Sequence, residues 1–254
     1  MKNFLIALLL GVTMISTAQE KVLLRLNYEK GQKYMIDMKM DQDVGAGFMT
    51  NNMHIQMKYT ITEVSDDTFE SSSRITKMVM DMNQAGISVS YDSTKKDEEL
   101  DETGKMMSSK MKPMLSATII TKGDNLGNVI ETKVEPSNVE GADNFTKQAG
   151  SIVYPKEAVG VGDTWTATKS EGGMDFVFNY KVASISSKNV FIDISGEVSG
   201  IATGDINGSM NIERDSGMAL ESKISMTMKI QGQDATTNMI ANLTKEQHIK
   251  QHSK

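Results

Sequence analysis

Residues 53–62, MHIQMKYTIT, alternate between apolar and polar side chains. Successive side chains of a strand point to opposite faces, so this period of two predicts a strand with one buried and one wet face. Residues 218–230 repeat the pattern. The apolar positions are Met53, Ile55, Met57, Tyr59 and Ile61 in the first stretch, and Met218, Leu220, Ile224, Met226, Met228 and Ile230 in the second. Such one-sided alternation is typical of antiparallel sheets.

Turn-forming residues recur between the alternating runs, as expected of a chain that folds back on itself. They are Glu29-Lys30-Gly31, Ser65-Asp66-Asp67, Lys122-Gly123-Asp124, Ser186-Ser187-Lys188-Asn189 and Asp215-Ser216-Gly217. The chain has no cysteine, so a packed core and not a disulfide framework must hold the fold. The pattern predicts a mainly β protein with one or two short helices.

The two halves of the chain resemble each other. GQKY at 31–34 and GDTW at 162–165 each open a strand, and MKYTITEVSDDTFESSSRI at 57–75 aligns with FNYKVASISSKNVFIDISG at 178–196. The alignment predicts two similar antiparallel β lobes of the curved-sheet or half-barrel type. The alternative is that any two amphipathic hairpins look alike.

These signals divide the chain into five segments. They are a signal peptide at 1–18, a first β lobe at 19–96, a connecting segment at 97–150, a second β lobe at 151–244 and a polar tail at 245–254. The connecting segment is expected to hold a charged loop at 94–105 and a β-hairpin. Between them, Met106–Met114 adds a helical turn. The capping box Ser137-Asn138-Val139-Glu140 predicts a short helix at about 138–149.

The first eighteen residues have the parts of a secretory signal peptide. Lys2 supplies the positive charge, residues 4–10 the apolar run, and Ser16-Thr17-Ala18 the small residues before a cut. We therefore expect a protein of the periplasm or the extracellular space, with no transmembrane segment in the mature chain. Without a cysteine it carries no lipid on an N-terminal cysteine, so it is not expected to be a lipoprotein.

Composition and motifs argue against several classes of function. A formal net charge of −6 argues against binding to nucleic acid. The Gly-x-Ser-x-Gly motif of a nucleophile elbow does not occur. Of the three histidines, His54 lies on the polar side of its strand, and His248 and His252 lie in the last seven residues. We expect no enzyme, no catalytic residue and no cofactor.

Several segments together carry a family resemblance. They are the signal peptide, LRLNYEKGQKY at 24–34, TIITKGDNLGNVIE at 118–131, YPKEAVGVGDTWT at 154–166 and RDSGM at 214–218. In these the chain resembles exported β-rich proteins found mainly in Bacteroidota, known as domain of unknown function 6263. The resemblance implies an exported, uncharacterised protein with no assigned catalytic residue. In outline alone it is similar to the half-barrel lipoprotein carriers of the periplasm.

Methionine is unusually frequent, with 21 residues against 7 Phe, 6 Tyr and 1 Trp. Flexible, polarisable thioethers suit a surface that accepts varied apolar ligands, although the same side chains also fill cores. The leading hypothesis is an exported, non-catalytic protein that holds a hydrophobic small molecule or an envelope protein against a β face. The candidate ligand-binding residues are Met38, Met57, Tyr59, Met78, Met80, Trp165, Phe178 and Tyr180.

The alternative hypothesis is a Cu(I)-binding or oxidant-buffering envelope protein, because thioether sulfur is a soft ligand for Cu(I). Its candidate ligands are Met106, Met107, Met111 and Met114, which stand in a polar context where a core role is less evident. Elsewhere, spacings such as Met226/Met228 follow from strand geometry, since positions i and i+2 share a face.

Overall fold

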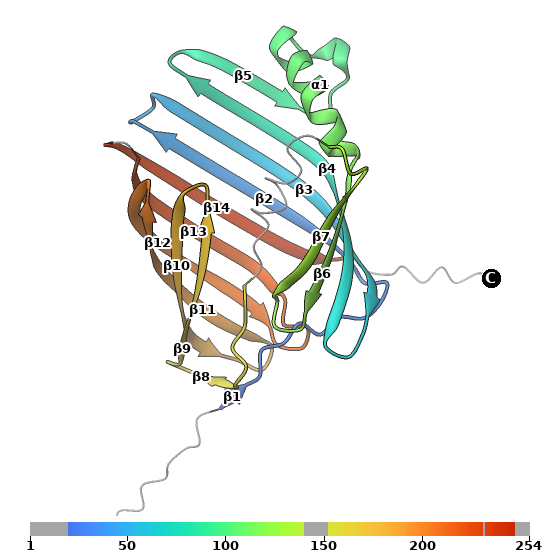
Figure 1. Cartoon of the computed structure of the whole chain (residues 1–254), viewed down its shortest axis with the longest axis vertical. Helices are drawn as coiled ribbons and strands as arrows, with labels where there is room; N and C mark the ends of the chain where they lie inside the picture. The colour runs from blue at the N-terminus through green and yellow to red at the C-terminus, as the bar shows by residue number, and fades with distance from the viewer. Residues whose placement is uncertain (1–19, 140–151, 231, 247–254) are drawn as a thin grey trace, which may run out of the picture.

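The computed structural model describes residues 20–139, 152–230 and 232–246, and most of them form one antiparallel sheet (Figure 1). The strands lie in the order β7-β6-β4-β3-β2-β14-β13-β12-β11-β10-β9, and β5 also pairs with β4. Their bounds are β2 Lys33–Val44, β3 Met49–Val64, β4 Thr68–Gln84, β5 Ile87–Asp92, β6 Thr118–Asp124, β7 Val129–Glu135, β9 Thr164–Glu171, β10 Met174–Ile185, β11 Asn189–Gly200, β12 Ala202–Glu213, β13 Ala219–Ile230 and β14 Gln233–Lys245.

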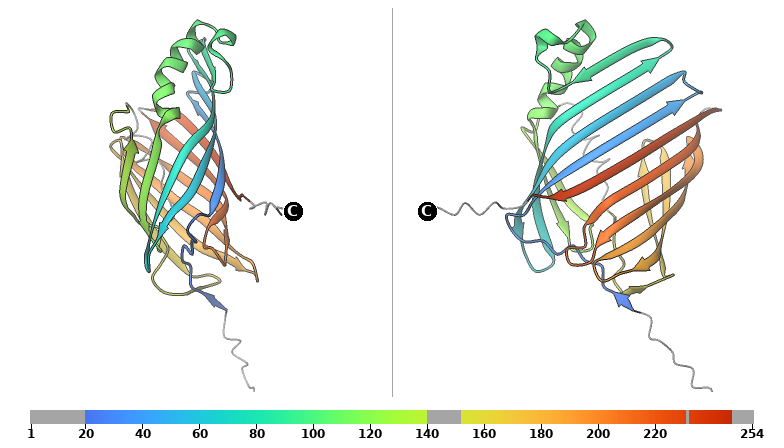
Figure 2. Two further views of the ribbon diagram at one scale, coloured as in Figure 1. Left: turned by 90° about the vertical axis from the view of Figure 1, so that its right-hand side faces the viewer. Right: turned by 180° about the vertical axis from the view of Figure 1, so that it is seen from behind.

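The sheet is curved and open, with β7 and β9 at its two edges (Figures 1 and 2). Two short strands, β1 (Lys21–Val22) and β8 (Val159–Gly160), pair with each other outside it. The helical elements are the 3-10 turn η1 (Asp97–Glu99) and the helix α1 (Glu102–Ser116). The predicted class, a mainly β antiparallel protein with an open curved sheet and a helix, is confirmed.

The two predicted lobes form two runs of neighbouring strands in the same sheet. The C-terminal strand β14 pairs with the N-terminal strand β2 over eleven residue pairs, from Ala235 opposite Val44 to Lys245 opposite Tyr34. Strands β9 to β14 therefore continue into β2, β3, β4, β6 and β7 without a break in hydrogen bonding. The two halves are continuous at β14–β2.

The aligned segments of the two halves share the same local structure. Gly31 (φ 87°) donates its N–H to the carbonyl of Ile61, and Gly162 (φ 89°) donates its N–H to the carbonyl of Val182, both at 2.8 Å. Just after these acceptors the strand register shifts, at Ile61/Glu63 and Val182/Ser184. The two halves therefore agree in these backbone hydrogen bonds and in the positions of their register shifts. This agreement supports an internal duplication over a chance likeness of two hairpins.

At one border of the sheet, two segments of the chain cross its concave side and cover it. We call this border the closed border. Leu24 and Tyr154, both almost fully buried, pack there against Val182 and Val190. The hydroxyl of Tyr154 donates to the carbonyl of Gly217 at 2.6 Å. The segments before β2 and before β9 thus close this border, near β1 and β8 in Figure 1.

The helix of the connecting segment is longer than predicted. The loop prediction for 94–105 is wrong at its end, because α1 already begins at Glu102. The Asp101 carboxylate accepts the N–H of Gly104 at 2.7 Å and so satisfies a free donor of the first turn. The predicted β-hairpin is present as β6–β7. Nearly all of the predicted helix at 138–149 lies outside the described residues.

Two glycines allow the sharp bend between β12 and β13. A Cβ atom built on Gly204 would lie 2.0 Å from the carbonyl oxygen of Thr227, and one built on Gly208 would lie 2.3 Å from that of Lys223. Both obstacles are backbone atoms, which cannot move aside without opening the sheet. Curved sheets use glycine at such bends because it brings no side chain into the concave surface.

We expect Gly208→Ala to destabilise the protein by about 2 kcal/mol, since the added methyl group must displace a paired strand. The neighbouring substitution Ser209→Ala, at an exposed position of the same strand, is the control and should change little. Urea unfolding monitored by circular dichroism measures both. Equal midpoints for the two variants would contradict this account of the bend.

Candidate functional site

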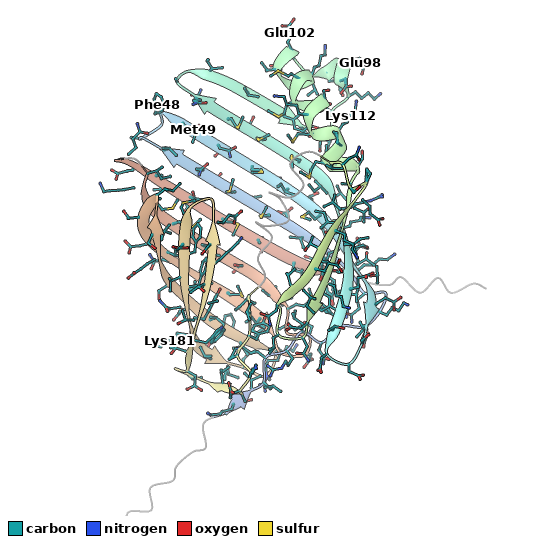
Figure 3. The ribbon with its side chains drawn as sticks, in the orientation of Figure 1. Phe48, Met49, Glu98, Glu102, Lys112 and Lys181 are labelled. Carbon is teal, nitrogen blue, oxygen red and sulfur yellow. The ribbon has the colours of Figure 1, made fainter. Side chains whose placement is uncertain are left out.

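One continuous row of side chains crosses the sheet on its concave side. Direct cross-strand pairing joins its ten members, one from each successive strand. They are Trp165, Tyr180, Ile194, Gly208, Ile224, Met239, Met40, Met53, Met80 and Tyr91. We call the side of the sheet that carries this row the inner face. Figure 3 shows sulfur atoms scattered over this face between the strands.

The outer face is polar, as the alternation predicts. His54 lies there with its Nε2 2.9 Å from Asp37 Oδ2, and Gln56 donates to the same oxygen at 2.8 Å. These hydrogen bonds hold the pKa of Asp37 below its usual range. Farther along the outer face, polar side chains including Asn179 and Asn207 line a depression. The apolar clusters of the sheet therefore lie on its inner face, and the outer face carries scattered apolar side chains such as Ile240 among polar ones.

Three predicted ligand-binding residues lie beneath α1. Met38, Met57 and Met78 belong to a cluster around the buried Ile55 and Tyr91. The helix covers this cluster with Met107, Met111, Met114 and Leu115. These helical positions recur every three or four residues, which places them on one side of α1. Packing between helix and sheet explains all three strand methionines.

Three more predicted residues form an aromatic stack on β9 and β10. The rings of Trp165 and Tyr180 stack with centroids 5.2 Å apart, and those of Phe178 and Tyr180 lie 6.3 Å apart. The indole N–H of Trp165 donates to the carbonyl of Val153 at 3.0 Å. Phe176 extends the stack toward the far end of the strand. The stack packs against the buried chain that closes this border.

Tyr59, the seventh predicted residue, belongs to a tyrosine cluster at the closed border. Its ring centroid lies 6.4 Å from that of Tyr28 and 6.3 Å from that of Tyr34. Burial raises the pKa of Tyr28 and of Tyr59 and raises the pKa of Tyr34 to about 12. The hydroxyl of Tyr34 donates to Gln32 at 2.7 Å. This cluster packs with Ile61, so its first role is structural.

Met80, the eighth predicted residue, lies on a more open part of the inner face. It is half-buried and directly follows Met239, Met40 and Met53 in the cross-strand row. Sequence reasoning missed Met40 and Met239 as partners of Met80. Met239 joins the row only through the β14–β2 pairing, whereas Met40 joins it through the consecutive strands β2, β3 and β4. The available signal was their alternation, which already assigns each methionine to the apolar side of its strand.

A short polar strip lies beside this part of the cross-strand row. Thr237, Gln42 and Asn51 are paired across β14, β2 and β3 on the inner face. The amide of Gln42 donates to the Thr237 hydroxyl at 3.5 Å. The side-chain oxygen of Asn51 is buried and has no hydrogen-bond partner among the described residues. An unpaired buried acceptor of this kind costs stability, which a donor that reaches it would restore.

The four methionines of the copper hypothesis do not converge. Met107, Met111 and Met114 face the cluster beneath α1, whereas Met106 is 52% exposed. Within the described ranges, no group of three or more His, Asp or Glu side chains is placed to hold a metal ion. The two terminal histidines, His248 and His252, lie outside the described residues.

Comparison with known proteins finds one protein family whose model matches part of the chain. Residues 141–244 match the model of a family described as a family of unknown function (DUF6263). No curated protein matches the chain. The family match covers the second half, from the segment before β8 to β14. It does not reach the first half, where the sequence resemblance was also drawn. Among the described residues no helix is long and apolar enough to span a bilayer.

We expect Met107→Ala and Met111→Ala each to destabilise the protein by roughly 1–2 kcal/mol, less than a full core truncation because both side chains are only half-buried. Met106→Ala is the matched control on the exposed side of α1 and should have little effect. Chemical unfolding curves give the three values. A control as costly as the other two would refute the assigned orientation of the helix.

The buried tyrosines predict a loss of stability at alkaline pH. Tyrosines in the unfolded chain ionise near pH 10. The folded chain keeps Tyr28, Tyr34 and Tyr59 protonated to higher pH, so unfolding releases protons above about pH 10 and stability falls as the pH rises further. Urea midpoints between about pH 8 and about pH 12 measure this decline. The substitution Tyr28→Phe should make it shallower, and an unchanged slope would exclude Tyr28 as a contributor.

Proposed function

We propose that this protein is an exported, non-catalytic binding protein that holds an amphiphile with a long apolar chain on the inner face of its sheet. The observation that carries the proposal is the half-buried methionine row Met239–Met40–Met53–Met80. On β2 and β3 this row lies between the helix-covered cluster, which Met53 contacts, and the hairpin that joins the two strands. A continuous apolar surface of this kind is typical of a ligand-binding face.

The dimensions of this surface suit an extended acyl chain. From Ile224 on β13 to Met80 on β4 the row spans four strand spacings of about 4.8 Å each, or about 19 Å. Methionine adapts its three rotatable bonds to the shape of a flexible ligand. A chain lying along the row replaces water on each thioether and needs no directional contact with the protein.

The polar strip can orient the ligand on the inner face. Asn51 and Gln42 lie one inner-face position beyond the methionine row, toward the hairpin that joins β2 to β3. A hydroxyl, amide or ammonium group of the ligand can donate to the Asn51 side-chain oxygen. The ligand then lies with its polar head near this hairpin and its chain on the methionines.

Export is part of the proposal. The signal-peptide features of residues 1–18 and the resemblance to exported proteins of Bacteroidota both support a periplasmic or extracellular location. In that compartment an amphiphile needs a protein surface to leave a membrane, which suits a binding protein.

The test of the methionine row is binding of the fluorescent fatty acid cis-parinaric acid to the mature chain. Its carboxylate only accepts hydrogen bonds, so this probe reports on the apolar row and not on Asn51. We expect saturable binding that weakens about tenfold or more when Met40, Met80 and Met239 are replaced together by Gln, because polar amides then line the row. The matched control replaces Lys39, Val79 and Ile240 by Gln, since these neighbours lie on the outer face of the same strands. Loss of binding in both variants, or in neither, would exclude the inner face as the site.

The copper alternative rests on one observation: seven methionines pack in or against the cluster beneath α1, namely Met38, Met53, Met57, Met78, Met107, Met111 and Met114. Replacing Met106, Met107, Met111 and Met114 together by Leu keeps an apolar surface and removes the sulfur ligands. On the ligand proposal the Leu variant retains cis-parinaric acid binding and wild type shows no tight Cu(I) binding. Tight Cu(I) binding that is lost in the Leu variant would support the alternative.

A further inference from the structure

Five hairpins meet at the border of the sheet opposite the closed one. They join β2 to β3, β4 to β5, β9 to β10, β11 to β12 and β13 to β14. Hydrogen bonds link neighbouring tips: the carbonyl of Phe48 accepts from Ala85 at 2.9 Å, and the N–H of Ile201 donates to Gly173 at 3.1 Å. We call these five tips the rim; the tips of β2–β3 and β4–β5 lie at the left in Figure 1.

Large apolar side chains are exposed at three of the five tips. Phe48 is 52% exposed, Ile87 71% and Ile201 65%. Phe48 is labelled in Figure 3, at the end of the β2–β3 hairpin. Tips of hairpins ordinarily carry polar residues, and large apolar side chains gathered at one border mark a contact surface.

The two borders differ in their charged residues. The rim segments VGAGFMT at 44–50, NQAGIS at 83–88 and SGIATG at 199–204 contain no charged residue. The turns at the closed border, in contrast, contain several charged residues. They are Ser65-Asp66-Asp67, Ser186-Ser187-Lys188 and Arg214-Asp215-Ser216. Because both borders are built from hairpins of one sheet, turn geometry alone does not explain the difference.

We propose that the rim docks on a zwitterionic lipid bilayer and places Phe48, Ile87 and Ile201 in its interface. Apolar side chains bind to an interface by leaving water, without any need for basic residues. The residues that flank the tips are net acidic: Asp43, Glu171, Asp175 and Asp234 against Lys229, a formal charge of 1 − 4 = −3. Lys229 is paired with Asp234 at 3.1 Å. This charge disfavours an anionic membrane.

The rim is continuous with the inner face. Val44 and Met49, the paired residues next to the β2–β3 tip, lie on the inner face, and Asn51 and Gln42 follow them toward the methionine row. An amphiphile could then pass from bilayer to methionine row without crossing water. This last step rests on the proposed function, whereas docking itself depends on the rim alone.

The experiment is co-flotation of the full mature chain with phosphatidylcholine vesicles. The rim variant replaces Phe48, Ile87 and Ile201 by Ser. The control variant replaces Val64, Phe191 and Ile240 by Ser, which are exposed by 41%, 41% and 40% away from the rim. We expect partitioning to fall about tenfold or more in the rim variant only. It should be unchanged at about 1 M salt, where charge effects are screened.

Three results would overturn the docking proposal: no flotation of the wild-type chain, equal loss in both variants, or binding that requires anionic lipid. A wild-type dimer in sedimentation that the rim variant abolishes would instead assign the rim to a second copy of the chain. The same variants are assayed with cis-parinaric acid. A wild-type chain that binds cis-parinaric acid but does not float with the vesicles would refute the docking and leave the proposed function standing.

Discussion

The pairing of β14 with β2 is the contact on which the rest of the structure depends. It joins the last strand of the chain to the first long strand and so turns two runs of hairpins into one sheet. The curvature of that sheet gives the inner face its concave form, and the methionines of β14 and β2 become neighbours only across this seam. Without the seam, Met239 would be separated from Met40, Met53 and Met80, which the consecutive strands β2, β3 and β4 bring together.

The sequence predicts the strands well because their information is local. Alternation at residues 53–62 assigns Ile55 to the buried side and His54 to the polar side, and both assignments hold. All eight candidate ligand-binding residues lie on the inner face for the same reason. Their common face follows from a period of two. Their division into packed and half-buried groups depends on which other segments cover them.

Three features could not be read from local patterns. The length of α1 was underestimated because Gly104 and Pro113 are poor helix residues. The helix is held by tertiary contacts of Met107, Met111 and Met114, together with the Asp101 cap. The seam between β14 and β2 depends on register between residues about 200 positions apart, and a single sequence carries no signal for such a pairing. The rim escaped notice for a related reason, since its five tips are distant in sequence.

The seam has a consequence for the order of folding. Most hairpins of this sheet can form as soon as their two strands are available, but β2 must wait for the last strand of the chain before its second edge is covered. Until then it is an unpaired edge beside apolar side chains, which is a site for association with other chains. A polypeptide that becomes available for folding amino end first, as in synthesis, therefore carries this open edge until β14 has been made. Protection by a chaperone during that interval matters more for this chain than for a fold that closes from its amino end.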